Sequence, residues 1–114
     1  MTINDRIRKQ LIKRDPYCIH CGDDDDLVIH HRKNRGMGGS KLLDHYPNLL
    51  RICAEYNGQM ESHAIWAEQA REFGHKLESW QDFSEPVYDR CAGIWYVLLN
   101  DGTKETVDEP GGIF

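Results

Sequence analysis

Residues 29–40 read Ile-His-His-Arg-Lys-Asn-Arg-Gly-Met-Gly-Gly-Ser, and they follow the apolar residues Leu27 and Val28. This apolar run, which ends in two histidines, predicts a short strand over residues 27–31. Successive side chains of a strand point to opposite faces, so His30 and His31 can serve different partners. One can face a metal ion and the other a water, because neutral imidazole binds metals and titrates near neutral pH. Taken alone, two adjacent histidines are more often incidental surface residues.

The segment after the histidines combines glycines with basic side chains. Gly36, Gly38 and Gly39 predict a loop whose backbone can approach a phosphate closely. The net charge of −5 argues against a protein that coats nucleic acid by bulk electrostatics. Local phosphate binding depends on the local field instead. The basic residues expected to neutralise a DNA backbone are Arg32, Lys33, Arg35 and Lys41.

The composition indicates a small globular protein of one domain with a short appendage. The 114 residues are 39% hydrophobic and 29% charged, and none of their apolar runs approaches the roughly 20 residues of a membrane span. The start of the sequence has no apolar signal segment. We therefore expect a cytoplasmic protein without membrane contact, whose four cysteines are reduced or bound to metal.

The cysteines suggest an incomplete zinc site. Cys18 and Cys21 are separated by two residues and followed by glycine, a spacing that can aim both sulfurs at one zinc ion. Cys53 offers a third ligand, but Tyr56 stands where its partner cysteine is expected. Cys91 or a histidine can complete the site, or the cysteines can form a packing cluster without metal. A redox pair is disfavoured because no βαβ pattern surrounds it.

The remaining periodicities predict an α+β domain. An amphipathic helix is expected over residues 3–14, ending before Pro16, and a second strand over 49–53, antiparallel to the first. One helix is expected over 57–73, with Gly74 as its C-terminal cap. Near the C-terminus, two strands flank the turn signal Asn-Asp-Gly at 100–102 and predict a hairpin.

These pieces, in this order and spacing, resemble the HNH endonuclease family, most closely the small HNH proteins of bacteriophages and prophages. The resemblance covers residues 5 to about 75 and implies a ββα-metal fold (His-Me finger, treble-clef-like). Residues 1–79 then form the HNH domain, and residues 80–114 form a hairpin and tail packed on it. The matching motifs are Cys18-x-x-Cys21-Gly22, Val28-Ile29-His30-His31, Gly38-Gly39, Asn48-Leu49-Leu50-x-x-Cys53 and Glu61-Ser62-His63.

The resemblance also implies roles for individual residues. His31 takes the position of the general base and His30 that of a metal ligand, while Asn48 orients the loop and supports the base. The third motif position, usually a histidine preceded by cysteine, is Asn57 preceded by Tyr56. The sequence is therefore an HNN variant, in which the Asn57 carbonyl oxygen can ligate a hard cation.

One further metal ligand stays open between two residues. His63 matches a histidine of the phage proteins, and Glu61 lies one helical turn after Asn57. The expected cofactors are a divalent metal ion, Mg²⁺, Mn²⁺ or Ni²⁺, and a structural zinc ion at Cys18, Cys21 and Cys53.

The resemblance predicts a metal-dependent endonuclease that hydrolyses phosphodiester bonds in DNA. Nicking is the natural product of one such site, and cutting both strands needs a homodimer or two successive events. A phage origin would place the protein in the host cytoplasm, with a terminase as a further partner if it assists DNA packaging. The alternative is a non-catalytic zinc module that binds DNA or protein and is indifferent to replacement of His31.

Overall fold

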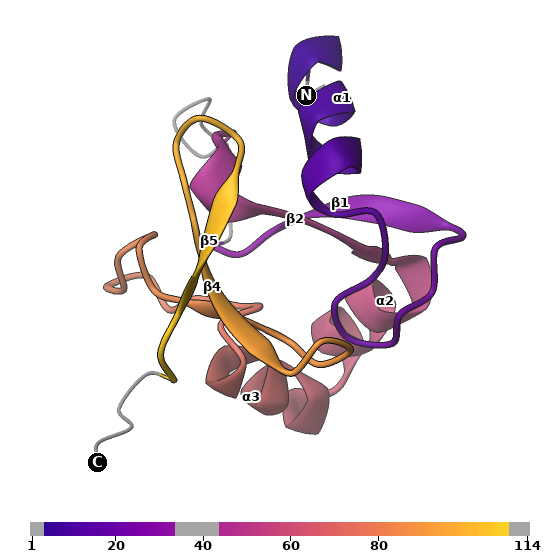
Figure 1. Ribbon diagram of the computed structural model, residues 1–114. Helices are drawn as coiled ribbons and strands as arrows, with labels where there is room; N and C mark the ends of the chain where they lie inside the picture. The colour runs from indigo at the N-terminus through magenta and orange to yellow at the C-terminus, as the bar shows by residue number, and fades with distance from the viewer. Residues whose placement is uncertain (1–3, 34–43, 110–114) are drawn as a thin grey trace.

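The first helix, α1, spans Asp5–Arg14 and begins where a side chain can cap it. The computed structural model describes residues 4–33 and 44–109 (Figure 1). Asn4 Oδ1 accepts a hydrogen bond from the Ile7 amide at 3.0 Å, which satisfies one of the free amides of the first turn. The helix ends at Arg14, next to Asp15 and Pro16 as expected. The predicted helix is thus confirmed over its described residues.

Two strands form the ribbon on which the predicted site depends. β1 (Leu27–His31) pairs antiparallel with β2 (Leu49–Cys53), as the sequence predicts, with His30 opposite Leu50 and His31 opposite Leu49. A 3₁₀ turn, Tyr46–Asn48, leads into β2. Figure 1 shows α1 on one side of this ribbon and α2 on the other.

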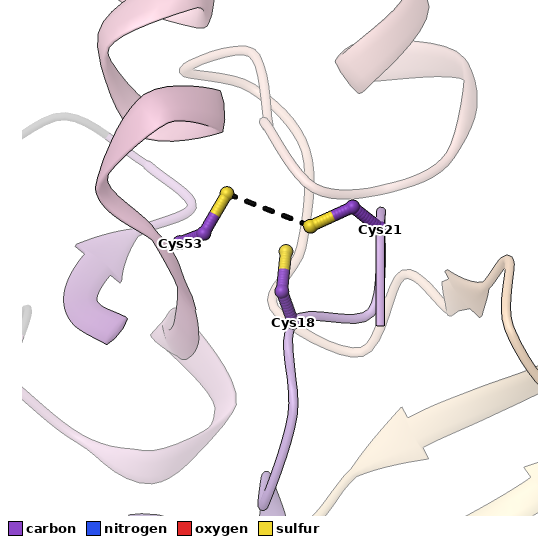
Figure 2. Close-up of side chains that lie close together, drawn as sticks. All are labelled: Cys18, Cys21 and Cys53. Carbon is purple, nitrogen blue, oxygen red and sulfur yellow. Dashed lines mark hydrogen bonds between the residues drawn. The ribbon is translucent and has the colours of Figure 1, made fainter. Parts of the chain in front are cut away.

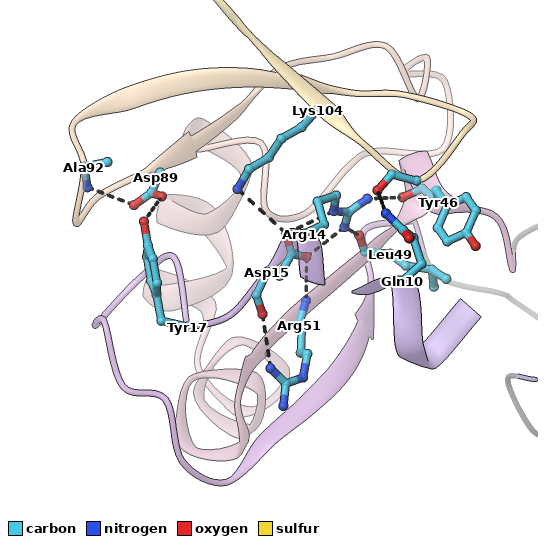
Figure 3. A network of polar contacts seen from close by, with 11 residues as sticks. Gln10, Arg14, Asp15, Tyr17, Tyr46, Leu49, Arg51, Asp89, Ala92 and Lys104 are labelled. Atoms are coloured by element: carbon cyan, nitrogen blue, oxygen red, sulfur yellow. Dashed lines mark hydrogen bonds and ion pairs between the residues drawn. The ribbon is translucent and has the colours of Figure 1, made fainter. Parts of the chain in front are cut away.

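Polar contacts at the end of α1 fasten this helix to β2 (Figure 3). Arg14 and Asp15 form a buried ion pair of 2.8 Å. The Arg14 guanidinium also donates to the carbonyl oxygens of Tyr46 and Leu49. Asp15 accepts from the Arg51 amide, and its backbone carbonyl accepts from the Arg51 guanidinium at 3.1 Å. The ion pair is buried with its remaining hydrogen-bonding groups satisfied, the condition under which burial of charge is tolerated.

The single helix predicted over 57–73 is wrong, because the structure has two helices there. α2 covers Ala54–Ser62 and α3 covers Ala64–Glu72, separated by His63 in extended conformation (φ −128°, ψ 123°). α2 buries Tyr56 and Met60, whereas α3 buries Ala67 and Ala70. The change of direction at His63 lets each helix turn its own apolar residues inward. One straight helix would instead have buried a single apolar stripe.

Gly74 ends α3 as predicted, and its packing explains the choice of glycine. Its φ of +74° favours glycine, and a Cβ atom there would lie 1.9 Å from the Pro86 carbonyl oxygen. The chain after α3 therefore runs tightly against residues 86–87. This close approach brings the C-terminal segment against the helices.

The C-terminal segment forms three strands, one more than the predicted hairpin. β4 (Ile94–Leu98) and β5 (Lys104–Val107) confirm the hairpin, and β3 (Val87–Asp89) adds a strand on the other side of β4. β3 has only three residues, too few for an alternation pattern to show in sequence.

One hydrophobic core joins the two sheets with α2 and α3. Val87 and Leu98 of the C-terminal sheet belong to the same buried cluster as Leu50, Ile52 and Tyr56. None of the described helices is long and apolar enough to cross a membrane. Residues 1–3, 34–43 and 110–114 lie outside the described part of the chain, and with them the predicted glycine loop, Arg35 and Lys41.

Candidate functional site

His30 lies on the face of the β1–β2 ribbon that is covered by α2. It is only 5% exposed, its Nε2 lies 2.8 Å from the His75 carbonyl oxygen, and the Asn57 side chain lies close enough to influence its pKa. Burial lowers the pKa of His30 to about 4, so the imidazole is neutral at pH 7. Because a carbonyl only accepts, Nε2 carries the proton and Nδ1 keeps its lone pair. The structure therefore brings two of the predicted metal ligands, His30 and Asn57, together.

Of the two candidates for a further ligand, Glu61 interacts with His30 through its charge. The Glu61 carboxylate acts on the pKa of His30 by its charge, and it forms an ion pair of 3.6 Å with Lys76. His63 occupies the exposed junction between α2 and α3. Within the described residues, His63 belongs to no cluster of three histidine, cysteine or acidic ligand groups. The same is true of Glu61 and His30, so the charge interaction with His30 is what distinguishes Glu61 from His63.

His31 lies on the opposite face of the ribbon, where it meets a partner that sequence reasoning missed. Its Nε2 is 2.6 Å from Asp44 Oδ1, and both side chains are partly exposed. The same face forms a groove lined by Arg8, Ile12, Ile29, His31 and Arg51. Asp44 is 13 residues away in sequence, outside any short motif, so no local signal marks it as a partner of His31.

Asn48 fixes the backbone where the chain leaves β1. Its side chain is fully buried, and its Oδ1 accepts from the Lys33 amide at 2.7 Å. Its backbone carbonyl accepts from the Arg32 amide, also at 2.7 Å. These bonds hold the end of β1 against the turn before β2. Asn48 is thus placed to orient the segment that follows His31, the position that the resemblance implies for it.

Arg32 is placed differently from the prediction, which made it a phosphate contact. It is fully buried, and its guanidinium donates to four carbonyl oxygens at 2.6–3.1 Å. Those carbonyls belong to Pro47, Gly74, Phe83 and Glu85. Four of its five N–H donors are engaged inside the protein, so Arg32 holds the C-terminal segment against the end of β1. It cannot also bind a DNA backbone.

Lys33 is tied to the same C-terminal segment as Arg32. Its Nζ donates to the Gln81 carbonyl at 2.6 Å and lies 4.4 Å from the centre of the Phe83 ring. Of the four basic residues predicted to bind DNA, Arg32 and Lys33 therefore bind backbone carbonyls of the protein. The other two, Arg35 and Lys41, lie outside the described residues.

Three cysteines form a cluster that can bind a metal ion (Figure 2). The sulfurs of Cys18, Cys21 and Cys53 lie within 4.8 Å of one another, and those of Cys21 and Cys53 are 3.6 Å apart. Zn–S bonds of about 2.3 Å place tetrahedral sulfurs roughly 3.8 Å apart, so the spacing fits zinc. The turn of residues 18–22 closes through a bond of 2.7 Å from the Gly22 amide to the Cys18 carbonyl. Cys53 Sγ caps α2 by accepting from the Tyr56 amide.

Tyr56 replaces a cysteine ligand with a core side chain. Its ring stacks on His20, with centroids 3.8 Å apart, and its hydroxyl lies 2.6 Å from His75 Nδ1. His75 Nε2 in turn lies 2.7 Å from the Tyr88 carbonyl oxygen. Since that carbonyl fixes the proton on Nε2, the Tyr56 hydroxyl donates to Nδ1. The Tyr56 side chain is thus part of the core and does not supply the fourth zinc ligand that a cysteine at this position would supply.

Replacing Tyr56 with phenylalanine should destabilise the protein by about 1–3 kcal/mol, because His75 Nδ1 would remain buried without a donor. Urea unfolding monitored by circular dichroism measures the loss. The Tyr96→Phe control removes a hydroxyl from a partly exposed ring and should change stability by less than about 0.5 kcal/mol. Equal stability of Tyr56→Phe and the wild type would contradict the assigned hydrogen bond.

Stability should fall as the pH falls below the ordinary histidine range. His75 is fully buried, and burial lowers its pKa from 6.5 to about 3. The unfolded chain therefore binds a proton that the folded protein does not, between pH 6.5 and about 3. Below pH 6.5, His75 lowers the stability by about 1.4 kcal/mol per pH unit, and His30, whose pKa is also lowered by burial, adds to this loss. Urea midpoints of metal-free protein at pH 7, 6 and 5 test this, and a flat profile would contradict it.

Comparisons with known protein families, with curated proteins and with solved structures found no match. The described residues show a small α+β domain with three α-helices, two small antiparallel sheets and a three-cysteine cluster. The function follows from what these side chains can do in this arrangement.

Proposed function

We propose that the protein is a metal-dependent DNA endonuclease with a ββα-metal site. One observation carries the proposal: the β1–β2 ribbon runs directly into α2 and holds consecutive histidines in two different environments. His30 faces Asn57 on α2 in a buried setting, and His31 faces Asp44 and a groove. In the proposal, His30 holds the metal ion and His31 activates the water, and both act on the same phosphate.

The donor set around His30 fits a divalent cation. It offers His30 Nδ1, the Asn57 carbonyl oxygen and the Glu61 carboxylate, a mixture that suits Mg²⁺, Mn²⁺ or Ni²⁺. The hydrogen bond from His30 Nε2 to the His75 carbonyl fixes the ring and its tautomer, as is usual for ligating histidines. A bound ion would neutralise charge on the phosphate and on the leaving oxygen.

His31 is the general base in this proposal. The Asp44 carboxylate accepts from Nε2, which leaves the lone pair on Nδ1 to take a proton from water. The water oxygen then bonds to phosphorus, the bond from phosphorus to the 3′ oxygen breaks, and that oxygen gains a proton from solvent. Asp44 also stabilises the imidazolium that forms. Arg8 and Arg51 line the same groove, where their positive charges fit a phosphate backbone.

Nicking of supercoiled plasmid by zinc-loaded protein, with Mg²⁺, Mn²⁺ or Ni²⁺ added in increasing amounts, tests the proposal. We expect nicking that saturates with metal. Glu61→Gln should raise the metal concentration for half-maximal rate more than His63→Ala does, because the Glu61 charge already acts on His30. Folded, zinc-loaded protein that fails to nick with any of these metals would refute the nuclease.

The three-cysteine cluster favours one second candidate, a zinc module that binds DNA without cleaving it. Such a module needs the metal at Cys18, Cys21 and Cys53 but no base at His31. DNA binding that is lost on zinc removal, unchanged in His31→Ala and unaccompanied by nicking would support this candidate.

A further inference from the structure

We propose that Cys91 is the fourth ligand of a zinc ion held by Cys18, Cys21 and Cys53. The ion would then fasten the turn between β3 and β4, residues 90–93, to the turn of residues 18–22. This inference does not depend on the proposed nuclease activity, because it concerns a structural metal away from His30 and His31.

The Cys91 thiol already lies against the cysteine turn. Its Sγ is 3.7 Å from the Cys18 carbonyl oxygen. A Cβ atom built on Gly22 would be 3.0 Å from the same sulfur, so the thiol occupies the space that a side chain at position 22 would take. Glycine at position 22, with φ of +81°, therefore serves the turn and also admits Cys91.

The β3–β4 turn is held in this place by hydrogen bonds on both sides of Cys91. Asp89 Oδ1 accepts from the Cys91 amide at 2.9 Å. Figure 3 shows the other two bonds of this carboxylate, from the Ala92 amide to Oδ1 at 2.9 Å and from the Tyr17 hydroxyl to Oδ2 at 2.7 Å. The Arg90 amide donates to the Ile19 carbonyl at 2.8 Å. Tyr17 and Ile19 flank Cys18, so residues 89–92 are docked on the chain that carries two of the ligands. This docking positions the thiol before metal binds.

Other neighbouring groups are already engaged. Zinc in structural sites takes four ligands, and three cysteines supply only three. The Tyr56 hydroxyl is bonded to His75. His20 stacks on Tyr56, and its Nε2 lies 2.8 Å from the Arg90 guanidinium, which can only donate to it. Cys91 is exposed and has only the weak contact of its thiol with a carbonyl to give up.

Binding requires a modest rearrangement. Cys91 lies outside the group of three sulfurs, so its thiol must turn from the Cys18 carbonyl toward them. That turn is a change of side-chain rotamer at an exposed residue, and the backbone bonds of Asp89 and Arg90 can stay in place.

Thiol reactivity tests the assignment directly. Zinc-loaded wild-type protein is treated with iodoacetamide, and the modified cysteines are identified by peptide mass spectrometry. We expect Cys91 to be protected to the same degree as Cys21, the other exposed cysteine of the site, and both to react after zinc is removed with EDTA. Cys18 and Cys53 are buried, so their protection does not report on zinc. Rapid modification of Cys91 alone in the zinc-loaded protein would overturn the proposal.

Zinc affinity gives a second, independent measurement. In competition with a chromophoric chelator, Cys91→Ser should bind zinc at least 10–100-fold more weakly, since even loss of an outer-shell partner costs about that much. Ala92→Ser, a change at the next exposed residue of the same turn, should bind zinc like the wild type. Circular dichroism of the metal-free proteins checks that both variants fold. Equal zinc affinity of Cys91→Ser and Ala92→Ser would overturn the proposal.

Discussion

His31→Ala should nick plasmid DNA at least about 100-fold more slowly than the wild type, because positioned proton transfer is typically worth roughly 10²–10⁴-fold. The reason lies in the pairing of His31 Nε2 with Asp44 at 2.6 Å, which leaves Nδ1 as the only ring nitrogen able to accept a proton. The measurement is the initial rate of nicking at saturating metal. Zinc content and circular dichroism should match the wild type, because His31 is partly exposed and lies away from the cysteine cluster.

Two further variants test whether a loss of nicking in His31→Ala is due to loss of the base. Asp44→Asn should reduce nicking less than His31→Ala, because the base remains while the partner that orients it is weakened. His45→Ala removes a neighbouring imidazole whose ring packs on Phe83, and should nick at the wild-type rate. Equal nicking by His31→Ala and wild type would indicate a contaminating nuclease, and the assignment of the base would have to be withdrawn.

Arg32→Met should lower the free energy of unfolding by about 3–5 kcal/mol, the range expected when one partner of a buried, charged hydrogen-bonding network is removed. Four carbonyl oxygens would lose the guanidinium as a donor, two in buried and two in part-buried hydrogen bonds. Since small domains are stable by only about 5–15 kcal/mol, this loss is a large part of the total. Urea unfolding of metal-free protein measures it.

The neighbouring residue supplies the control for Arg32. Lys33→Met removes one donor to the Gln81 carbonyl from a partly exposed site, and should cost less than about 1 kcal/mol. Arg32→Lys should rescue little, because an ammonium cannot match the fork of a guanidinium. If Arg32→Met kept full stability and instead weakened DNA binding, the phosphate role predicted from sequence would be restored.

Local sequence signals were sufficient for the elements nearest the site. The apolar runs that end at His31 and Cys53 predicted β1 and β2 with their observed bounds, and the turn signal at 100–102 predicted the β4–β5 hairpin. The spacing of Cys18 and Cys21, with Cys53 at the end of β2, predicted the cluster that the structure contains. The strands and the hairpin depend on residues close in sequence. The cluster could be predicted because cysteines at this spacing are typical zinc ligands.

The sequence by itself therefore determined the ribbon, the first helix and the set of residues available for metal and base. Only the tertiary structure decided what several of them contact: Arg32 turns inward to carbonyls up to 53 residues away, Tyr56 meets His75, and His31 meets Asp44. It also placed the break at His63 and brought Cys91 beside Cys18, 73 residues earlier in the chain. The physical reason is that periodicity and spacing report local conformation. The partner of a buried charge or thiol is set by which distant segments pack together.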